Sequence, residues 1–200
     1  AFALQQQLSS EKLLISYFDA TDFDNHQQFY NDLPVKPSIV LYAAGFLVQN
    51  EEAIPDFEKT FTMMKVHYCG ALSMLNIIVM DYENTRLRKI IGLSSLSGVR
   101  GRKSNFIYGS TKAAFTQYLA GLRQYLFPRK VTVNVIVAGY IRSKMTAGLG
   151  LTESLMLEPV FIAKAVVNAG SRFTIVPGFK WKIIYNMLRI MPEGLVAKLP

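Results

Sequence analysis

The sequence is poor in the residues that build disulfides and metal sites. It contains one cysteine, Cys69, and two histidines, His26 and His67, among 200 residues. A single cysteine excludes an internal disulfide framework and any Cys-x-x-Cys metal or redox motif. Two histidines far apart in the chain give no spacing typical of a zinc site, so we expect no bound metal. These absences favour a reduced, cytoplasmic setting.

Long apolar runs, internal repeats and low-complexity segments are also missing. No continuous apolar run reaches the roughly 20 residues of a membrane-spanning helix. Acidic residues are few, 14 against 22 basic ones, so the formal net charge is +8. This charge favours anionic partners such as phosphates or an acidic membrane surface. The basic residues form no long run, and we therefore expect no nucleic acid partner.

Half of the residues are apolar, which suits the core of one globular domain. Short apolar segments alternate with helical patterns, and this alternation predicts a doubly wound parallel sheet in a three-layer α/β/α arrangement. The expected strands are Lys12–Phe18, Ser38–Gly45, Lys89–Ser94, Val131–Val137 and Phe173–Val176. The expected helices are Phe23–Leu33, Phe57–Asp81, Asn105–Leu126 and Glu158–Asn168, and Ala1–Leu8 has the pattern of a helix end.

The most informative stretch runs from Ile91 to Lys112. It predicts a buried strand, a polar loop with glycines, and a helix that starts near Asn105. Tyr108 and Lys112 are four residues apart and therefore share one face of that helix. Ser95 ends the strand, where open α/β sheets bind ligands. An ammonium group lowers the pKa of a nearby phenol towards the range of a proton donor, and a serine hydroxyl can hold a carbonyl oxygen.

This arrangement, Tyr108-x-x-x-Lys112 with Ser95 upstream, resembles the active-site signature of the short-chain dehydrogenase/reductase family. The flanking segments Ile-Ile-Gly-Leu-Ser-Ser and Val-Thr-Val-Asn-Val strengthen the resemblance, which covers roughly Lys12 to Thr146. The resemblance implies a Rossmann-like fold and an NAD(P)H-dependent carbonyl reductase. Tyr108 would then give the proton, Lys112 would bind the nicotinamide ribose, and Ser95 would orient the ketone. The alternative is a surface tyrosine–lysine pair on an amphipathic helix.

The same resemblance implies two groups of cofactor contacts, one beside the adenine and one in the turn that follows the expected strand Ser38–Gly45. Asp19 and Ala20 match the acidic turn of the family and would lie beside the adenine. Ala43-Ala44-Gly45 stands where the family has Asn-Ala-Gly, and these small residues allow the backbone to pass close to the cofactor. An ordinary turn between strand and loop is the alternative for this segment.

On the nicotinamide side, Ala138-Gly139-Tyr140-Ile141-Arg142-Ser143 occupies the place of the family's Pro-Gly-x-x-x-Thr. The resemblance puts Gly139 in the turn and makes Ile141 and Ser143 face the nicotinamide carboxamide. Asn134 matches a structural asparagine of the preceding strand. His67 replaces the asparagine of the family's Asn-x-x-Gly motif and is expected in the catalytic set. It can relay a proton, being a side chain that titrates near neutrality, or it can be a buried helix histidine with satisfied hydrogen bonds.

One family motif is absent from this chain. The glycine-rich turn Thr-Gly-x-x-x-Gly-x-Gly, which holds the pyrophosphate at a helix N-terminus, does not occur. We therefore expect the fold to lack its first βαβ segment, and the sequence to be a fragment of a longer protein. Without that segment it should bind dinucleotide poorly. The expected cofactor is NADP or NAD, with a slight preference for NADP.

The loop before Tyr108 carries Arg100, Arg102, Lys103 and Asn105. Cations at the mouth of an active site can hold a substrate phosphate, arginine in bidentate fashion. We expect Arg100, Arg102 and Asn105 to contact substrate together with Ser95. A solvated surface loop is an equally reasonable interpretation.

The sequence divides into a dehydrogenase-like domain, 1–177, and a basic amphipathic helix, 178–200. On a helical wheel Lys182, Asn186 and Arg189 share one narrow face, and apolar residues cover the rest. This pattern favours an interfacial membrane helix at the inner face of the cytoplasmic membrane. A helix buried in a homodimer or homotetramer interface is the alternative.

Together these features resemble the bacterial branch of the family that contains decaprenylphosphoryl-2-keto-pentose reductase. The resemblance implies hydride transfer to a keto-sugar carried by a polyprenyl phosphate. A soluble ketone or secondary alcohol is the alternative substrate. A non-catalytic dinucleotide-fold binding protein is the alternative function, because the glycine-rich turn is absent.

Overall fold

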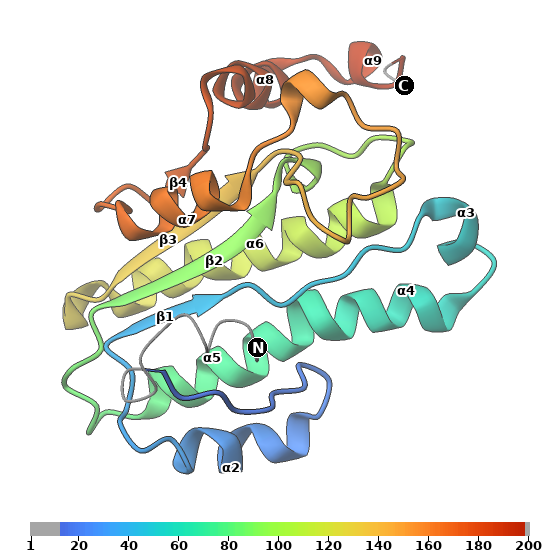
Figure 1. Cartoon of the computed structure of the whole chain (residues 1–200). Coiled ribbons are helices and arrows are strands. Elements are labelled where there is room, and N and C mark those ends of the chain that lie inside the picture. Colours follow the sequence, from blue (N-terminus) through green and yellow to red (C-terminus); the bar gives the residue numbers. More distant parts are fainter. Residues whose placement is uncertain (1–12, 199–200) are drawn as a thin grey trace.

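The structure, a computed structural model, describes residues 13–198. Within these residues four parallel strands form one sheet in the order β1-β2-β3-β4 (Figure 1). The strands are β1 (Ile39–Tyr42), β2 (Lys89–Ser95), β3 (Thr132–Ala138) and β4 (Thr174–Ile175). The longer helices are α2 (His26–Asn31), α4 (Phe57–Met64), α5 (Gly70–Met80), α6 (Phe106–Leu126), α7 (Pro159–Val167) and α8 (Phe179–Ile190), and the short ones are α3 (Asn50–Ala53) and α9 (Glu193–Val196).

The two central strands, β2 and β3, carry the register that builds the site. They pair from Lys89 with Thr132 to Ser95 with Ala138. No residue of either strand is exposed and most are buried, as expected for strands that are covered on both faces. Because parallel strands end at the same edge, the polar turn after Ser95 lies beside the turn after Ala138.

Helices cover the two faces of the sheet unequally. Helices α5 and α6 pack on one face, where Leu75, Phe115 and Leu119 meet Val133 and Val135 in the main core. Helix α7 packs on the other face, where Ile162 contributes to a smaller cluster with Ile91 and Ile136 (Figure 1). The strands lie in chain order, so the crossover through α7 has the opposite hand from the crossovers before it. The expected three-layer, Rossmann-like class is confirmed.

Helices α4 and α5 form one long helix that is interrupted by a π-helical turn at Lys65–Cys69. The whole helix, Phe57–Met80, is long and apolar enough to cross a membrane by length and composition alone. Its apolar side supplies Met74, Leu75 and Ile78 to the main core. We therefore interpret it as a core helix of the domain.

Two expected elements differ from the structure. Leu13–Phe18 forms no strand, and the sheet edge at β1 is paired only with β2 among the described residues. Ile39 and Leu41, on the face of β1 away from α5, are exposed. The segment after 177 is not one helix, because Pro192 follows α8 and separates it from α9. The expected helix end at Ala1–Leu8 lies outside the described residues.

Candidate active site

A cavity of about 240 Å³ opens at the carboxyl ends of β2 and β3. It lies where the polar ends of two adjacent parallel strands meet, the usual ligand position in α/β sheets. Ser95 and Tyr108 line it from β2 and α6, and Gly139 and Tyr140 line it from the turn after β3. The other lining residues are Leu47, Gln49, Ser97, Ser104, Asn105, Met145, Thr146, Leu149 and Leu151.

Tyr108 stands in the first turns of α6, with its hydroxyl directed towards Ser95. Burial raises the pKa of Tyr108, and a side-chain hydrogen bond with Ser95 opposes this rise. The spacing of Tyr108 and Lys112 predicts that the neighbouring ammonium lowers this pKa. Burial instead dominates, because the Nζ atom of Lys112 lies 5.8 Å from the centre of the phenol ring. The phenol is therefore protonated and able to donate.

Lys112 is buried, with 5% of its surface exposed. Its Nζ donates to the carbonyl oxygen of Leu93 at 3.3 Å, and no carboxylate pairs with it among the described residues. Burial lowers the pKa of Lys112 to about 8. A buried cation without an acidic partner destabilises the folded state. We therefore interpret the burial of Lys112 as serving the chemistry of the site and not the stability of the fold.

His67 is fully buried beneath the site, and both of its ring nitrogens have partners. The backbone N–H of Phe46 donates to Nε2 at 3.0 Å, and Nδ1 lies 2.7 Å from the hydroxyl of Thr111. Thr111 in turn donates to the carbonyl oxygen of Tyr108 at 2.8 Å. Burial, followed by the charge of Lys112, lowers the pKa of His67 to about 3. This environment favours a neutral His67. Its hydrogen bonds connect the turn after β1 to α6, and it is not suited to carrying a proton.

The residues present fit the nicotinamide end of a dinucleotide. Gly45 passes over His67 and Lys112 so closely that an added Cβ would lie 3.2 Å from Nζ of Lys112. A backbone without a side chain thus lies next to the buried ammonium, as the approach of a nicotinamide ribose requires. Tyr108 and Lys112 offer it a hydroxyl and an ammonium. No glycine-rich turn at a helix N-terminus occurs in the part of the chain that the structure describes.

Other expected cofactor contacts lie outside the cavity. The carboxylate of Asp19 accepts hydrogen bonds from the backbone and hydroxyl of Thr21, both at 2.8 Å. Ala20 is buried against α5, where its carbonyl oxygen would be 2.1 Å from a Cβ added at Gly70. Ala44 packs against the main core, whereas Ala43 is exposed. These four residues do not line the cavity, so their place beside a cofactor stays a prediction.

The turn after β3 differs in detail from the expectation. Gly139 lines the cavity, but Ile141 and Ser143 do not. Ile141 forms a bridge with Leu157, and the backbone N–H of Ser143 donates to the hydroxyl of Thr146 at 3.0 Å. Thr146 reaches the cavity in their place. Local hydrogen bonds of the loop thus decide which hydroxyl faces the site, and residue spacing alone does not reveal them.

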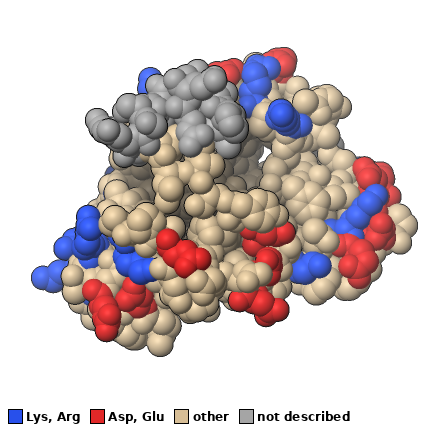
Figure 2. Space-filling model, turned by 60° about the horizontal axis from the view of Figure 1, so that its bottom comes forward, with Lys and Arg blue, Asp and Glu red and all other residues tan. Residues whose placement is uncertain are grey.

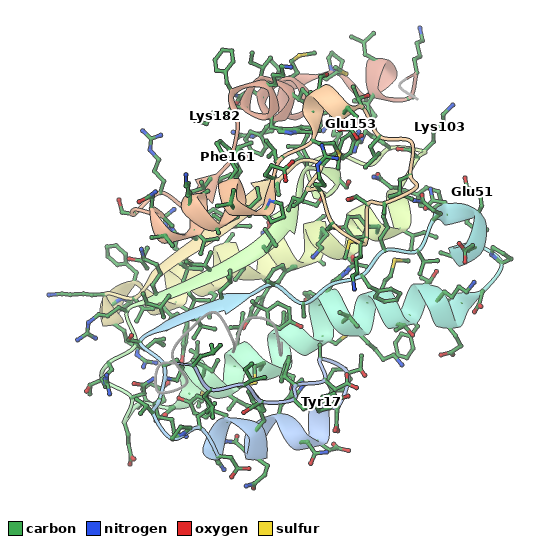
Figure 3. The ribbon with its side chains drawn as sticks, viewed as in Figure 1. Tyr17, Glu51, Lys103, Glu153, Phe161 and Lys182 are labelled. Atoms are coloured by element: carbon green, nitrogen blue, oxygen red, sulfur yellow. The ribbon has the colours of Figure 1, made fainter. Side chains whose placement is uncertain are left out.

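The basic loop before α6 is divided. Arg100 donates to the carbonyl oxygen of Met191 at 2.7 Å and pairs with Glu193 at 3.2 Å, so it holds the segment between α8 and α9. Arg102 has a buried Nε without a hydrogen-bond partner. Lys103 extends outward from the loop (Figure 3). None of the three cations lines the cavity, which leaves its interior free of charged side chains.

Asn105 and Ser97 form a polar pair inside the cavity. Nδ2 of Asn105 donates to the hydroxyl of Ser97 at 2.9 Å, and Oδ1 of Asn105 is buried without a partner. A buried acceptor without a partner inside a ligand cavity is available to a hydroxyl of the substrate. Asn105 can be predicted from the sequence as a substrate contact, whereas the only sequence signal for Ser97 is its position in the loop after Ser95.

Trp181 of α8 supports the cavity from behind, a contact that sequence reasoning missed. Its ring lies on Gly139, where an added Cβ would come within 2.0 Å of Cε2. It packs edge-on against Tyr140 with ring centroids 4.9 Å apart, and its Nε1 donates to the carbonyl oxygen of Leu155 at 2.9 Å. Arg142 closes the same loop through ion pairs with Glu153 and Glu158.

Comparison with known proteins identifies the family. The family model for short chain dehydrogenases matches residues 1–154. The chain belongs to the short-chain dehydrogenase family, whose members are oxidoreductases that use NAD or NADP. An uncharacterized oxidoreductase of Mycobacterium tuberculosis is 24% identical over 193 residues, which cover 92% of this chain and 75% of the relative. One from Staphylococcus epidermidis is 33% identical over 131 residues, 66% of this chain and 57% of the relative.

Solved structures share the fold at low identity. A short chain dehydrogenase from Burkholderia cenocepacia in complex with NADP has a TM-score of 0.77 and 20% identity, covering 89% of this chain and 74% of its own. One from Mycobacterium paratuberculosis bound to NAD has a TM-score of 0.70 and 19% identity, covering 81% and 71%. The family model and the related oxidoreductases confirm the expected family and enzyme class, and the solved structures confirm the fold.

Proposed function

We propose that this oxidoreductase is a carbonyl reductase whose substrate is a keto-sugar carried by a polyprenyl phosphate. The observation that carries the proposal is the cavity. Its polar lining consists of neutral hydroxyl and amide groups, among them Ser97, Asn105 and Thr146, and its remaining wall is apolar through Met145 and Leu149. Neutral hydrogen-bonding groups suit sugar hydroxyls, and the apolar wall suits the first units of a polyprenyl chain.

In the proposed reaction Ser95 donates a hydrogen bond to the ketone oxygen and fixes the carbonyl beside Tyr108. A reduced nicotinamide coenzyme, when bound, would supply the hydride that reduces the carbonyl carbon and would be oxidised to NAD(P)+. Tyr108 would transfer its phenolic proton to the carbonyl oxygen, which takes up the π electrons of the carbonyl, to give the alcohol. The charge of Lys112 stabilises the phenolate that remains, and it also holds the nicotinamide ribose. We propose that His67 positions these groups and transfers no proton.

We assign the substrate phosphate to the cavity mouth. Arg102 has a buried Nε without a partner, and Lys103 lies on the same loop with an exposed side chain. Arg100 is engaged by Glu193 and would contribute to this site only after exchanging that partner. Asn105, which begins α6 beneath this loop, would bind a sugar hydroxyl. A soluble ketone is the runner-up substrate.

NADP is the proposed coenzyme, with NAD as the alternative. The similarity to the NADP complex from Burkholderia cenocepacia supports this choice, as does the positive net charge, since NADP carries an additional phosphate. Fluorescence titration of the complete polypeptide with NADPH and NADH tests it. Tighter binding of NADH would overturn the preference without affecting the reaction class.

The decisive test compares substrates in the complete polypeptide. We would follow NADPH oxidation with a keto-pentosyl phosphate on a short prenyl chain, with the free keto-pentose, and with a simple aliphatic ketone. We expect kcat/KM to be highest for the prenyl-linked compound. Asn105→Ala should reduce kcat/KM for both sugars roughly tenfold or more, because a hydroxyl loses its acceptor, and should leave the aliphatic ketone nearly unchanged. Equal kcat/KM for all three compounds would favour the soluble-ketone alternative.

We further propose that the protein is a homodimer that pairs through α5 and α6. A groove of about 530 Å³ between these helices is lined by Asn76, Val79, Met80, Gln117, Tyr118, Gly121, Leu122 and Tyr125. No residue in this lining is charged, so a symmetric contact would bring no like charges together. Gly121 has open space at its Cβ position. Gly121→Gln should therefore produce a folded monomer, and an unchanged mass by light scattering would contradict this interface.

A further inference from the structure

A stretch of the chain around α7 and α8 carries charge of one sign only. Between Glu158 and Glu193 there is no acidic residue, whereas the same stretch contains Lys164, Arg172, Lys180, Lys182 and Arg189. The start of α7 and the start of α8 lie together, because a Cβ added at Gly178 would be 3.4 Å from the side chain of Leu157. Figure 1 shows both helices at the β4 side of the molecule, and Figure 3 places Phe161 and Lys182 there.

The exposed side of α8 is apolar along its length. Phe179, Ile183, Met187 and Ile190 have 77%, 46%, 50% and 82% of their surfaces exposed. Their spacing of four, four and three residues puts them on one face of the helix. The opposite face is buried through Trp181 and Leu188. The helix therefore has an outer apolar stripe that packing within the domain does not explain.

Cations border this outer stripe on both sides. At 100° per residue, Lys180 falls on one flank, and Lys182 and Arg189 fall on the other, with Asn186 next to them. The helical wheel predicts cations on one face of an otherwise apolar helix. The structure divides the apolar remainder into a buried side and an exposed side, so the arrangement is that of a helix lying at an interface. Helix α7 adds Val160 and Phe161 to the same end of the molecule, both largely exposed.

We propose that the outer face of α8 docks on an anionic lipid bilayer. The carboxylates near the start of α7, Glu153 and Glu158, are paired with Arg142. The exposed apolar side chains would enter the acyl-chain layer of the bilayer, and the flanking cations would contact its negatively charged headgroups. A second copy of this chain fits less well, because a two-fold contact would set Lys182 and Arg189 near their own copies. On the side seen in Figure 2, by contrast, acidic and basic residues are interspersed.

The docking face is one helix away from the active site. Trp181 on the inner side of α8 contacts Gly139 and Tyr140, and both residues line the cavity. A helix is roughly 10 Å across, so a headgroup at the docked face would be close to the cavity mouth. The link to a lipid-carried substrate rests on the proposed function, whereas docking itself does not.

The test is flotation of the complete polypeptide with vesicles of phosphatidylcholine alone or with one third phosphatidylglycerol. We expect binding to the anionic vesicles, little binding to phosphatidylcholine, and a decrease when salt is raised. The double variant Phe179→Ser/Ile183→Ser should reduce the bound fraction at least tenfold. Its reduction of a soluble ketone should be unchanged, because neither residue lines the cavity. Phe127→Ser is the matched control, an aromatic residue with 80% exposure after α6, and should bind as the parent protein does.

Absence of vesicle binding, or equal binding by the double variant, would overturn the proposal. A second result would also overturn it: the parent protein does not bind vesicles, and the double variant has a lower molar mass by light scattering than the parent. The outer face of α8 would then be an interface between copies of this chain. Vesicle binding without reduction of the prenyl-linked keto-sugar would refute the proposed substrate and leave the docking face standing.

Discussion

The backbone N–H of Phe46 donates a hydrogen bond to Nε2 of His67 at 3.0 Å. This contact makes Nε2 an acceptor, so in the neutral imidazole the proton resides on Nδ1 and is donated to Thr111. A continuous chain of hydrogen bonds then runs from the turn after β1 through His67 to the carbonyl of Tyr108. The histidine fixes the distance between the turn that approaches the cofactor and the helix that carries the proton donor.

The first prediction concerns acid stability. The pKa of His67 is about 3 in the folded state against an ordinary value of 6.5. Below pH 6.5 the unfolded chain therefore binds a proton that the folded chain does not. The free energy of unfolding should decrease by roughly 1.4 kcal/mol for each unit by which the pH is lowered. The contribution is complete above pH 6.5 and is lost as the pH approaches 3. Urea unfolding at several pH values measures it.

The matched variant for this measurement is His67→Gln, which keeps an amide donor and acceptor but does not titrate. Its stability should depend less on pH between 6.5 and 4 than that of the parent protein. Equal slopes for both proteins would show that His67 is protonated in the folded state. An inflection of kcat/KM near pH 6.5 that disappears in the variant would restore His67 as a proton carrier.

The second prediction tests the proton donor. Tyr108→Phe removes the phenolic proton and retains the ring, so kcat should fall by about 10²–10⁴. Stability should change little, because the ring keeps its edge-on packing against His67. Stopped-flow measurement of NADPH oxidation and thermal unfolding of the same samples give both quantities. Unchanged turnover would assign proton donation to another group.

A third prediction separates stability from activity at Lys112. The buried ammonium has no acidic partner within residues 13–198, so Lys112→Met should raise the free energy of unfolding at pH 7 by about 1–3 kcal/mol. The same change should abolish turnover, since the phenolate and the ribose lose their cation. A lower stability of the methionine variant would show that this ammonium contributes to folding.

The fourth prediction concerns the dependence of stability on pH in the alkaline range, where Lys112 titrates. The pKa of Lys112 is about 8 when folded and 10.5 ordinarily. Between these values the unfolded chain binds the additional proton, so stability should rise as the pH increases from about 8 towards 10. The difference in unfolding free energy between Lys112→Met and the parent protein should shrink over this range. A constant difference would contradict a buried lysine with a lowered pKa.

The fifth prediction addresses the contact between α8 and the cavity. Gly139→Ala places a methyl group inside the ring of Trp181, so we expect a loss of about 1–3 kcal/mol in stability and a raised KM. Gly170→Ala is the control, because an added Cβ there meets no atom within 4 Å. Equal melting temperatures for the two variants would show that α8 does not rest on this turn.

Some features of the site can be predicted from the sequence, and others depend on contacts between distant residues. The positions of Ser95, Tyr108 and Lys112 could be predicted, because a strand end, a short loop and a helical spacing of four are local properties. The expected strand at Lys12–Phe18 was wrong over its described residues, since apolar composition does not supply the neighbouring strand that must hydrogen-bond it. Likewise Arg100 carries the charge expected of a phosphate ligand, but Glu193, distant in the chain, already binds it.

The sequence by itself determined the family, the alternation of strands and helices, and the three residues proposed for the chemistry. Tertiary structure alone decided the partners and tautomer of His67, the pKa directions in the site, the pairing of Asn105 with Ser97, and the position of Trp181 on Gly139. The physical reason is the range of the interactions. Helical periodicity and turn chemistry act over a few residues, whereas burial and hydrogen bonding join residues that are far apart in the chain and meet only when the sheet and helices pack.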